Sequence, residues 1–131
     1  MAGHAVDTGN VRALRRPRVF VAASDRNFLR VAQFLLRRQG FDAGSTQRPR
    51  ELLAALDRER PDIVILDASD SLTEAAHLVG AIEAVHPHVT VVVVADDPGE
   101  QNDTLQVFAK WTSLETLVLK LEAMHLSRER F

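Results

Sequence analysis

Short apolar runs alternate with helically spaced apolar positions along most of the chain. The runs are rich in β-branched residues, as buried strands are, and they lie at 19–23, 41–46, 63–66, 90–95 and 104–109. Helical spacing predicts helices between them, over 26–39, 49–60, 71–85 and 112–124. Strands separated by helices pair in parallel through right-handed crossovers. The pattern therefore predicts an α/β fold.

Local signals support several of these helix boundaries. Asp25 can cap the first helix, and Gly40 can end it in a left-handed conformation. The segments 71–74 and 112–115 both have the capping-box sequence, a Ser or Thr followed three residues later by Glu. These signals place the starts of three helices and the end of one.

One connection is too short for a full crossover. Only eight residues, 96–103, separate the predicted fourth and fifth strands, and they include Pro98 and Gly99. A crossover that contains a helix needs roughly ten to twelve residues or more. We therefore predict a fourth helix that is short or missing.

Two charged residues stand where predicted strands end. Asp67 closes one strand and Lys110 closes the last one. The carboxyl ends of parallel strands share one edge of the sheet, so we expect these side chains to meet in a crevice there. The chain has fourteen arginines and two lysines. A lysine at position 110 therefore indicates that a compact point charge is required.

Composition indicates a single cytoplasmic domain. The 131 residues suffice for one core, with a flexible arm at 1–17, the domain at 18–126 and a short tail at 127–131. The net charge of −2 argues against binding to nucleic acid or to a membrane surface. The chain has no cysteine, and its apolar runs are far shorter than the roughly twenty residues of a membrane span.

The order of elements and the end of the third strand resemble the receiver domain of two-component response regulators. Pro61-Asp62-Ile63-Val64-Ile65-Leu66-Asp67, Lys110 and the stretch 28–41 carry the resemblance, which covers about residues 18–126. It implies a flavodoxin-like three-layer sandwich with five parallel strands in the order 2-1-3-4-5. It also implies that Asp67 accepts a phosphoryl group from a histidine kinase and that Lys110 pairs with that group.

The chain departs from the receiver pattern at several positions. Receivers usually end the first strand with two adjacent acids that hold Mg²⁺, and the matching residues here are Ala23 and Ser24, with Asp25 one step further on. Other positions lack the residue that the family usually has. Val94 or Ala95 replaces a residue with a hydroxyl group, Val107 replaces the switch aromatic, and Trp111 replaces a proline.

These departures leave the chemistry of the crevice open. Asp25 and Asp67 could hold Mg²⁺ together, but only if Asp25 turns inward instead of capping its helix. Without the acid pair, a structural ion pair between Asp67 and Lys110 is the alternative to a phosphoacceptor. Two roles are likewise possible for Trp111: it could belong to a contact surface, or it could pack over the shortened loop.

An enzyme is not expected. The loop 24–27 has no glycine to cradle a phosphate cofactor, and the chain has no Walker motif and no nucleophile elbow. The two hypotheses are a receiver phosphorylated on Asp67 and a phosphorylation-independent interaction module. The expected partners are a histidine kinase or another signalling protein, with a homodimer as an open alternative and no nucleic acid or membrane.

Overall fold

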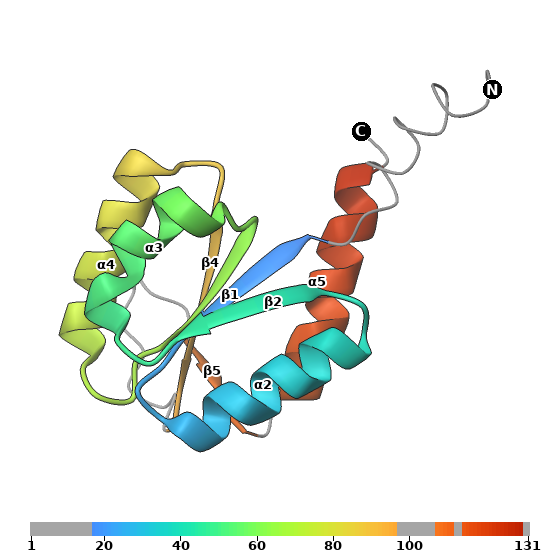
Figure 1. The fold of residues 1–131 in the computed structure, drawn as a ribbon, viewed down its shortest axis with the longest axis horizontal. Coiled ribbons are helices and arrows are strands. Elements are labelled where there is room, and N and C mark those ends of the chain that lie inside the picture. The colour runs from blue at the N-terminus through green and yellow to red at the C-terminus, as the bar shows by residue number, and fades with distance from the viewer. Residues whose placement is uncertain (1–16, 97–106, 112–113, 130–131) are drawn as a thin grey trace.

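The computed structural model describes residues 17–96, 107–111 and 114–129 (Figure 1). The described strands are β1 (Arg18–Ala22), β2 (Asp42–Thr46), β3 (Ile63–Asp67), β4 (Thr90–Ala95) and β5 (Val107–Ala109). The described helices are α2 (Arg26–Arg38), α3 (Leu52–Glu59), α4 (Leu72–Val85) and α5 (Leu114–Glu129), and a 3-10 turn, η1 (Pro49–Glu51), leads into α3.

The strands form one parallel sheet in the order β2-β1-β3-β4-β5. The central strand β3 pairs with β1 on one side and with β4 on the other, with Ile65 opposite Val21 and Val92. The strand order and the parallel pairing confirm the predicted flavodoxin-like topology.

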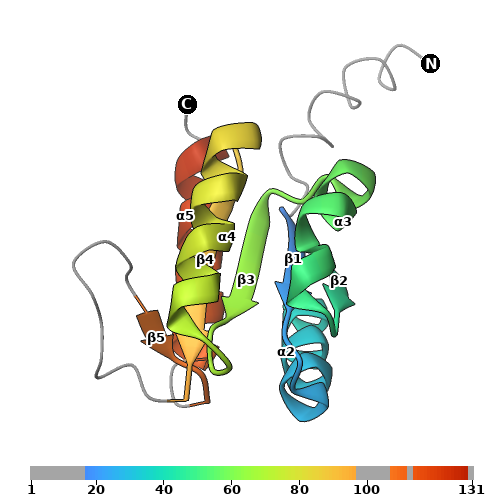
Figure 2. The ribbon, with the colours of Figure 1, turned by 90° about the vertical axis from the view of Figure 1, so that its left-hand side faces the viewer.

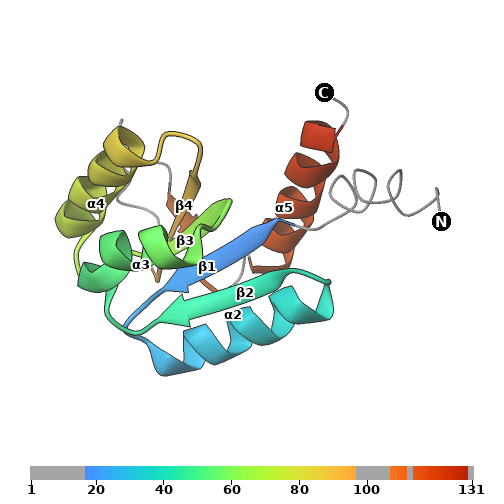
Figure 3. The ribbon, with the colours of Figure 1, turned by 45° about the horizontal axis from the view of Figure 1, so that its top comes forward.

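Among the described residues, α2 and α5 pack on one face of the sheet and α3 and α4 on the other, which gives three layers (Figures 2 and 3). Successive strand residues point to opposite faces, so each strand contributes to two cores. Val19 and Val21 of β1 pack with α2 and α5, whereas Phe20 and Ala22 pack with α3 and α4. All five residues of β3 are buried, which explains its uninterrupted apolar run.

Capping side chains set the starts of two helices as predicted. The Oδ1 atom of Asp25 accepts a hydrogen bond of 3.1 Å from the backbone N–H of Phe28. Ser71 Oγ accepts one of the same length from the N–H of Glu74. Gly40 has a φ of 92°, so the predicted left-handed end of α2 is confirmed.

Some predictions differ from the structure or fall outside the described residues. The described part of the fifth strand begins at Val107, and residues 104–106 are not described. Helix α5 continues to Glu129, so residues 127–129 of the predicted tail are helical. The arm at 1–16, residues 97–103 of the connection predicted to lack a helix, and the capping residues 112 and 113 are not among the described residues. In the described part of the chain, no helix has the length and apolar character needed to cross a membrane.

Candidate functional site

The carboxyl edge of the sheet brings together residues that are far apart in the sequence. Asp67 is the last residue of β3, Lys110 directly follows β5, and Asp25 lies in the loop after β1. The Nζ atom of Lys110 is 2.8 Å from Oδ2 of Asp67. The two residues that the sequence places at a shared edge therefore form an ion pair.

Lys110 also binds a second carboxylate. Its Nζ atom is 2.9 Å from Oδ2 of Asp25, 3.5 Å from Oγ of Ser69 and 3.8 Å from Oδ1 of Asp96. The lysine side chain is only 2% exposed. Its position is fixed by a hydrogen bond of 2.8 Å from its backbone N–H to the carbonyl of Ala95. One buried ammonium thus bridges two carboxylates, and we call Asp25, Asp67 and Lys110 the ion triad.

Asp25 divides its two oxygens between two tasks. Oδ1 caps α2 through the N–H of Phe28, while Oδ2 accepts the hydrogen bond from Lys110. The expectation that Asp25 must choose between capping its helix and facing the crevice is therefore wrong. A carboxylate has lone pairs on both oxygens, so a cap of this kind leaves one oxygen for a second partner.

Asp67 has its other oxygen bound by a residue that the sequence reasoning did not select. Its Oδ1 atom accepts hydrogen bonds from the backbone N–H of Ser69 at 2.9 Å and from the Ser69 hydroxyl at 2.6 Å. The hydroxyl oxygen in turn accepts a bond of 3.2 Å from the N–H of Asp96. The available signal was the Asp-x-Ser spacing, since an aspartate often bonds to the backbone two residues on.

The pKa shifts of Lys110 and Asp25 favour the charged form of each side chain. Burial lowers the pKa of Lys110, but its hydrogen bonds to Asp67 and Asp25 outweigh burial, and the net pKa is raised. The hydrogen bond from Lys110, followed by the backbone bond from Phe28, lowers the pKa of Asp25. Lys110 is therefore a permanent cation between the carboxylates of Asp25 and Asp67 at neutral pH.

The positions that match the missing acid pair contribute no carboxylate. Ala23 is fully buried in the core on the side of α2 and α5. Ser24 directs its hydroxyl to Oδ2 of Asp70, at 2.6 Å. The sequence predicted Asp25 and Asp67 as candidate metal ligands. In the structure, each directs an oxygen at Lys110. Among the residues that the structure describes, no group of three His, Asp or Glu side chains is arranged to hold a metal ion.

Two aromatic rings lie beside the ion triad. The Nζ atom of Lys110 is 5.2 Å from the centre of the buried Phe28 ring, within the range of a cation–π contact. Trp111 meets Phe28 edge-on, with ring centres 5.5 Å apart, and remains 46% exposed. Trp111 therefore packs on α2 and still presents about half of its surface to solvent.

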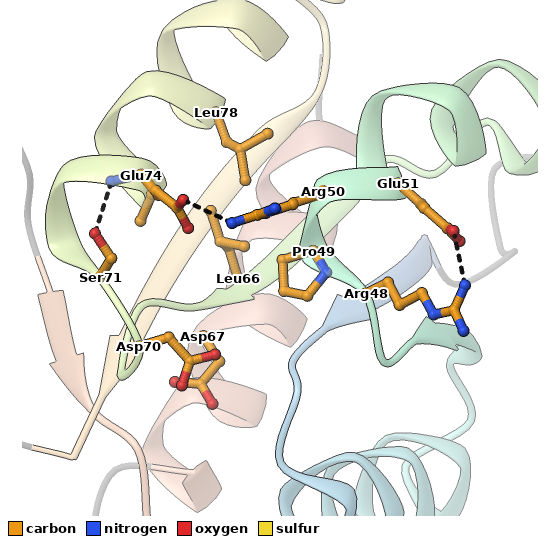
Figure 4. A pocket seen from close by; sticks show the side chains of 11 residues that line it. Arg48, Pro49, Arg50, Glu51, Leu66, Asp67, Asp70, Ser71, Glu74 and Leu78 are labelled. Atoms are coloured by element: carbon orange, nitrogen blue, oxygen red, sulfur yellow. Dashed lines mark hydrogen bonds and ion pairs between the residues drawn. The ribbon is translucent and has the colours of Figure 1, made fainter.

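A pocket of about 420 Å³ opens next to Asp67, between η1 and the start of α4 (Figure 4). Leu66, Ala75 and Leu78 supply its apolar lining, and an ion pair of 3.3 Å between Arg50 and Glu74 crosses from one side to the other. The further polar residues that line it are Arg48, Glu51, Asp70 and Ser71.

The fold is that of response-regulator receiver domains. No protein-family model and no curated protein matches the sequence. Among solved structures, a CheY-like receiver domain protein from Methanospirillum hungatei JF-1 is similar with a TM-score of 0.74 and 16% identity, over 88% of this chain and 98% of that one.

Two further solved structures support the same assignment of the fold. A response regulator from Thermotoga maritima has a TM-score of 0.70 and 20% identity, over 84% of this chain and 98% of that one. A structure described as an atypical orphan response regulator with a phosphorylation-independent regulatory mechanism has a TM-score of 0.69 and 23% identity, over 87% of this chain and 96% of that one. The TM-scores of these structures establish the shared fold, and the geometry of the site carries the inference about activity.

Proposed function

We propose that this chain is a signal-transduction module with a receiver fold, which acts through protein–protein contacts without being phosphorylated. In this proposal the ion triad is a fixed structural element. The observation that carries the proposal is the state of Asp67: its side chain is 3% exposed, and both of its oxygens already have strong partners.

A phosphoacceptor needs an oxygen that can attack phosphorus in line with the leaving group. In this chain Oδ2 of Asp67 is held by Lys110, and Oδ1 is held by two donors from Ser69. The second lone pair of Oδ2 could attack phosphorus only if the phosphoryl donor reached a side chain that is 3% exposed and lies beside the ammonium. The geometry therefore disfavours phosphoryl transfer to Asp67.

The path from the site to an output surface also lacks movable polar parts. Val94, Ala95 and Val107 stand where receivers usually have a hydroxyl and a switch aromatic. Each of the three is buried in a core that packs against the sheet. A ligand or modification shifts a two-state equilibrium only through contacts that differ between the states, and these apolar side chains offer no such contacts to a phosphoryl group.

One of the similar structures supports a role of this kind. It is described as an atypical orphan response regulator whose regulatory mechanism is independent of phosphorylation. A comparable role here would assign the chain no catalytic activity and a cytoplasmic location. Its partners would be a histidine kinase or another signalling protein, or a second copy of the chain.

The second candidate function is a receiver phosphorylated on Asp67. Two observations favour it: Asp67 and Lys110 do meet at the carboxyl edge, and the pocket of Figure 4 opens beside Asp67. This candidate requires an oxygen of the buried Asp67 side chain to become accessible to the phosphoryl donor.

Incubation with acetyl phosphate and Mg²⁺, followed by intact-mass measurement, separates the two candidates. We expect no phosphate adduct under conditions in which an active receiver domain is phosphorylated as a positive control. A phosphate adduct that disappears in Asp67→Asn and persists in Asp70→Asn would refute the proposal. Asp70 is the matched control because it is a neighbouring, exposed carboxylate outside the ion triad.

A further inference from the structure

We propose that the ammonium of Lys110 occupies the cation position of this site, so that the site is closed to Mg²⁺. The fold implies a divalent ion at the carboxyl edge of the sheet, and the side chains present do not fit one. This inference rests on the geometry of the ion triad and does not depend on the partner or output of the chain.

The carboxylate oxygens that a metal would use are already committed. Oδ2 of Asp25 and Oδ2 of Asp67 both lie within 2.9 Å of the Nζ atom of Lys110. Oδ1 of Asp25 caps α2, and Oδ1 of Asp67 accepts two hydrogen bonds from Ser69. A metal on the remaining lone pairs of these oxygens would lie beside the ammonium, and a metal on the occupied ones would displace the ammonium or the donors that hold the neighbouring loops.

A small divalent ion would have to use the same two carboxylates that face the ammonium. Mg²⁺ requires near-octahedral oxygen coordination at short distances and is held through one or two carboxylates together with water. Ser24 takes the place of a second acid and turns its hydroxyl to Asp70. Asp96, a third carboxylate among the described residues, is 3.8 Å from the ammonium and has a side chain that is 64% exposed.

The described neighbours of Lys110 enclose its side chain. Its side chain is 2% exposed, and its ammonium lies 5.2 Å from the centre of the Phe28 ring, which Trp111 contacts edge-on. A divalent ion that entered while Lys110 remained would face a full positive charge at close range. The ammonium therefore both neutralises the two carboxylates and repels a metal.

Titration with Mn²⁺ as a spectroscopic substitute for Mg²⁺ tests the inference. Electron paramagnetic resonance reports free Mn²⁺, so binding is measured directly and without any activity assay. We expect the unmodified chain to show no saturable binding at millimolar Mn²⁺. We expect Lys110→Met to bind Mn²⁺ more tightly by on the order of tenfold or more, because two facing carboxylates then lack a counterion.

Lys120→Met is the matched control. It removes the only other lysine of the chain, which lies outside the ion triad over the ring of Phe108, and it should leave Mn²⁺ binding unchanged. Saturable binding by the unmodified chain that is lost in Asp67→Asn would overturn the inference. A folded Lys110→Met variant that binds no more tightly than the unmodified chain would overturn it as well.

The titration of the unmodified chain decides the question even where the lysine variant does not fold. The outcome is also separable from that of the acetyl phosphate experiment. A phosphate adduct formed without Mn²⁺ binding would refute the proposed function and leave this inference intact. Mn²⁺ binding at the site without a phosphate adduct would refute this inference and leave the proposed function intact.

Discussion

Replacing Lys110 with methionine should strongly destabilise the fold. Methionine keeps an unbranched side chain of similar length but removes the charge. Breaking a buried ion pair costs about 3–5 kcal/mol, because the remaining charge is buried without compensation. Asp67 meets that condition, with a side chain that is 3% exposed. Asp25 is 37% exposed, so water can replace much of what it loses and its contribution is small.

The two hydrogen bonds from Ser69 to Asp67 remain in the variant and still compensate part of the buried charge. We therefore expect the free energy of unfolding to fall by an amount near the lower end of that range, about 3 kcal/mol at neutral pH. This is a large share of the roughly 5–15 kcal/mol by which domains are stable. Urea unfolding measures it, with fluorescence of Trp111 and far-ultraviolet circular dichroism as two probes. Trp111 is the only tryptophan and lies next to Lys110, so its signal reports on this edge of the sheet.

Lys120→Met provides the comparison, since the Nζ atom of Lys120 lies 4.7 Å from the centre of the Phe108 ring on an exposed part of α5. Its loss should cost at most about 1 kcal/mol. The double variant Lys110→Met, Asp67→Asn should recover part of the stability, because the uncompensated charge is then absent. A loss below about 1 kcal/mol for Lys110→Met alone would refute the assignment of the ion triad as a structural element.

Two further predictions concern pH and glycine. The raised pKa of Lys110 adds stability that is complete below its ordinary value of 10.5 and lost as the pH rises above it, whereas the lowered pKa of Asp25 adds stability that is complete above 3.8 and lost as the pH falls further. The urea midpoint should therefore not vary with pH through these two groups between about pH 5 and 9, where both contribute fully, and it should decline outside that range. An alkaline decline of equal size in Lys110→Met would contradict the assignment to Lys110. Gly44→Ala should cost about 1 kcal/mol in the same urea assay, because the added Cβ would lie 3.0 Å from Cδ1 of Phe20. Gly80→Ala in α4 should raise the free energy of unfolding by about 0.5–1 kcal/mol, because the added Cβ would have nothing within 4 Å. Equal effects of the two substitutions would show that the loss of backbone freedom outweighs the contact with Phe20.

The arrangement of the sheet could be predicted because burial leaves a direct trace in the sequence. The run 63–66 is apolar without interruption, and β3 is buried on both faces at the centre of the sheet. Asp67 and Lys110 follow from the same reasoning, since each ends a parallel strand at the shared edge. The resemblance to receivers then supplied the strand order, which local pattern alone does not determine.

The details of the site could not be predicted because they depend on how single side chains divide their hydrogen bonds. Capping and ion pairing were treated as exclusive for Asp25, whereas each oxygen serves one of them. Ser69 gives no periodic signal, and its role depends on a turn that brings its hydroxyl back to Asp67. The contact between Ser24 and Asp70 joins residues 46 positions apart, which no local pattern shows.

The ion triad also bears on the order in which the chain can become stable. Asp25 and Lys110 are 85 positions apart, so their contact is among the most non-local in the fold. During synthesis the amino-terminal strands leave the ribosome long before residue 110 does, and until then the edge of the sheet has two acidic side chains and no counterion. We therefore expect chains that end before Lys110 to be less stable than the full chain, because the last strand delivers the counterion of both carboxylates.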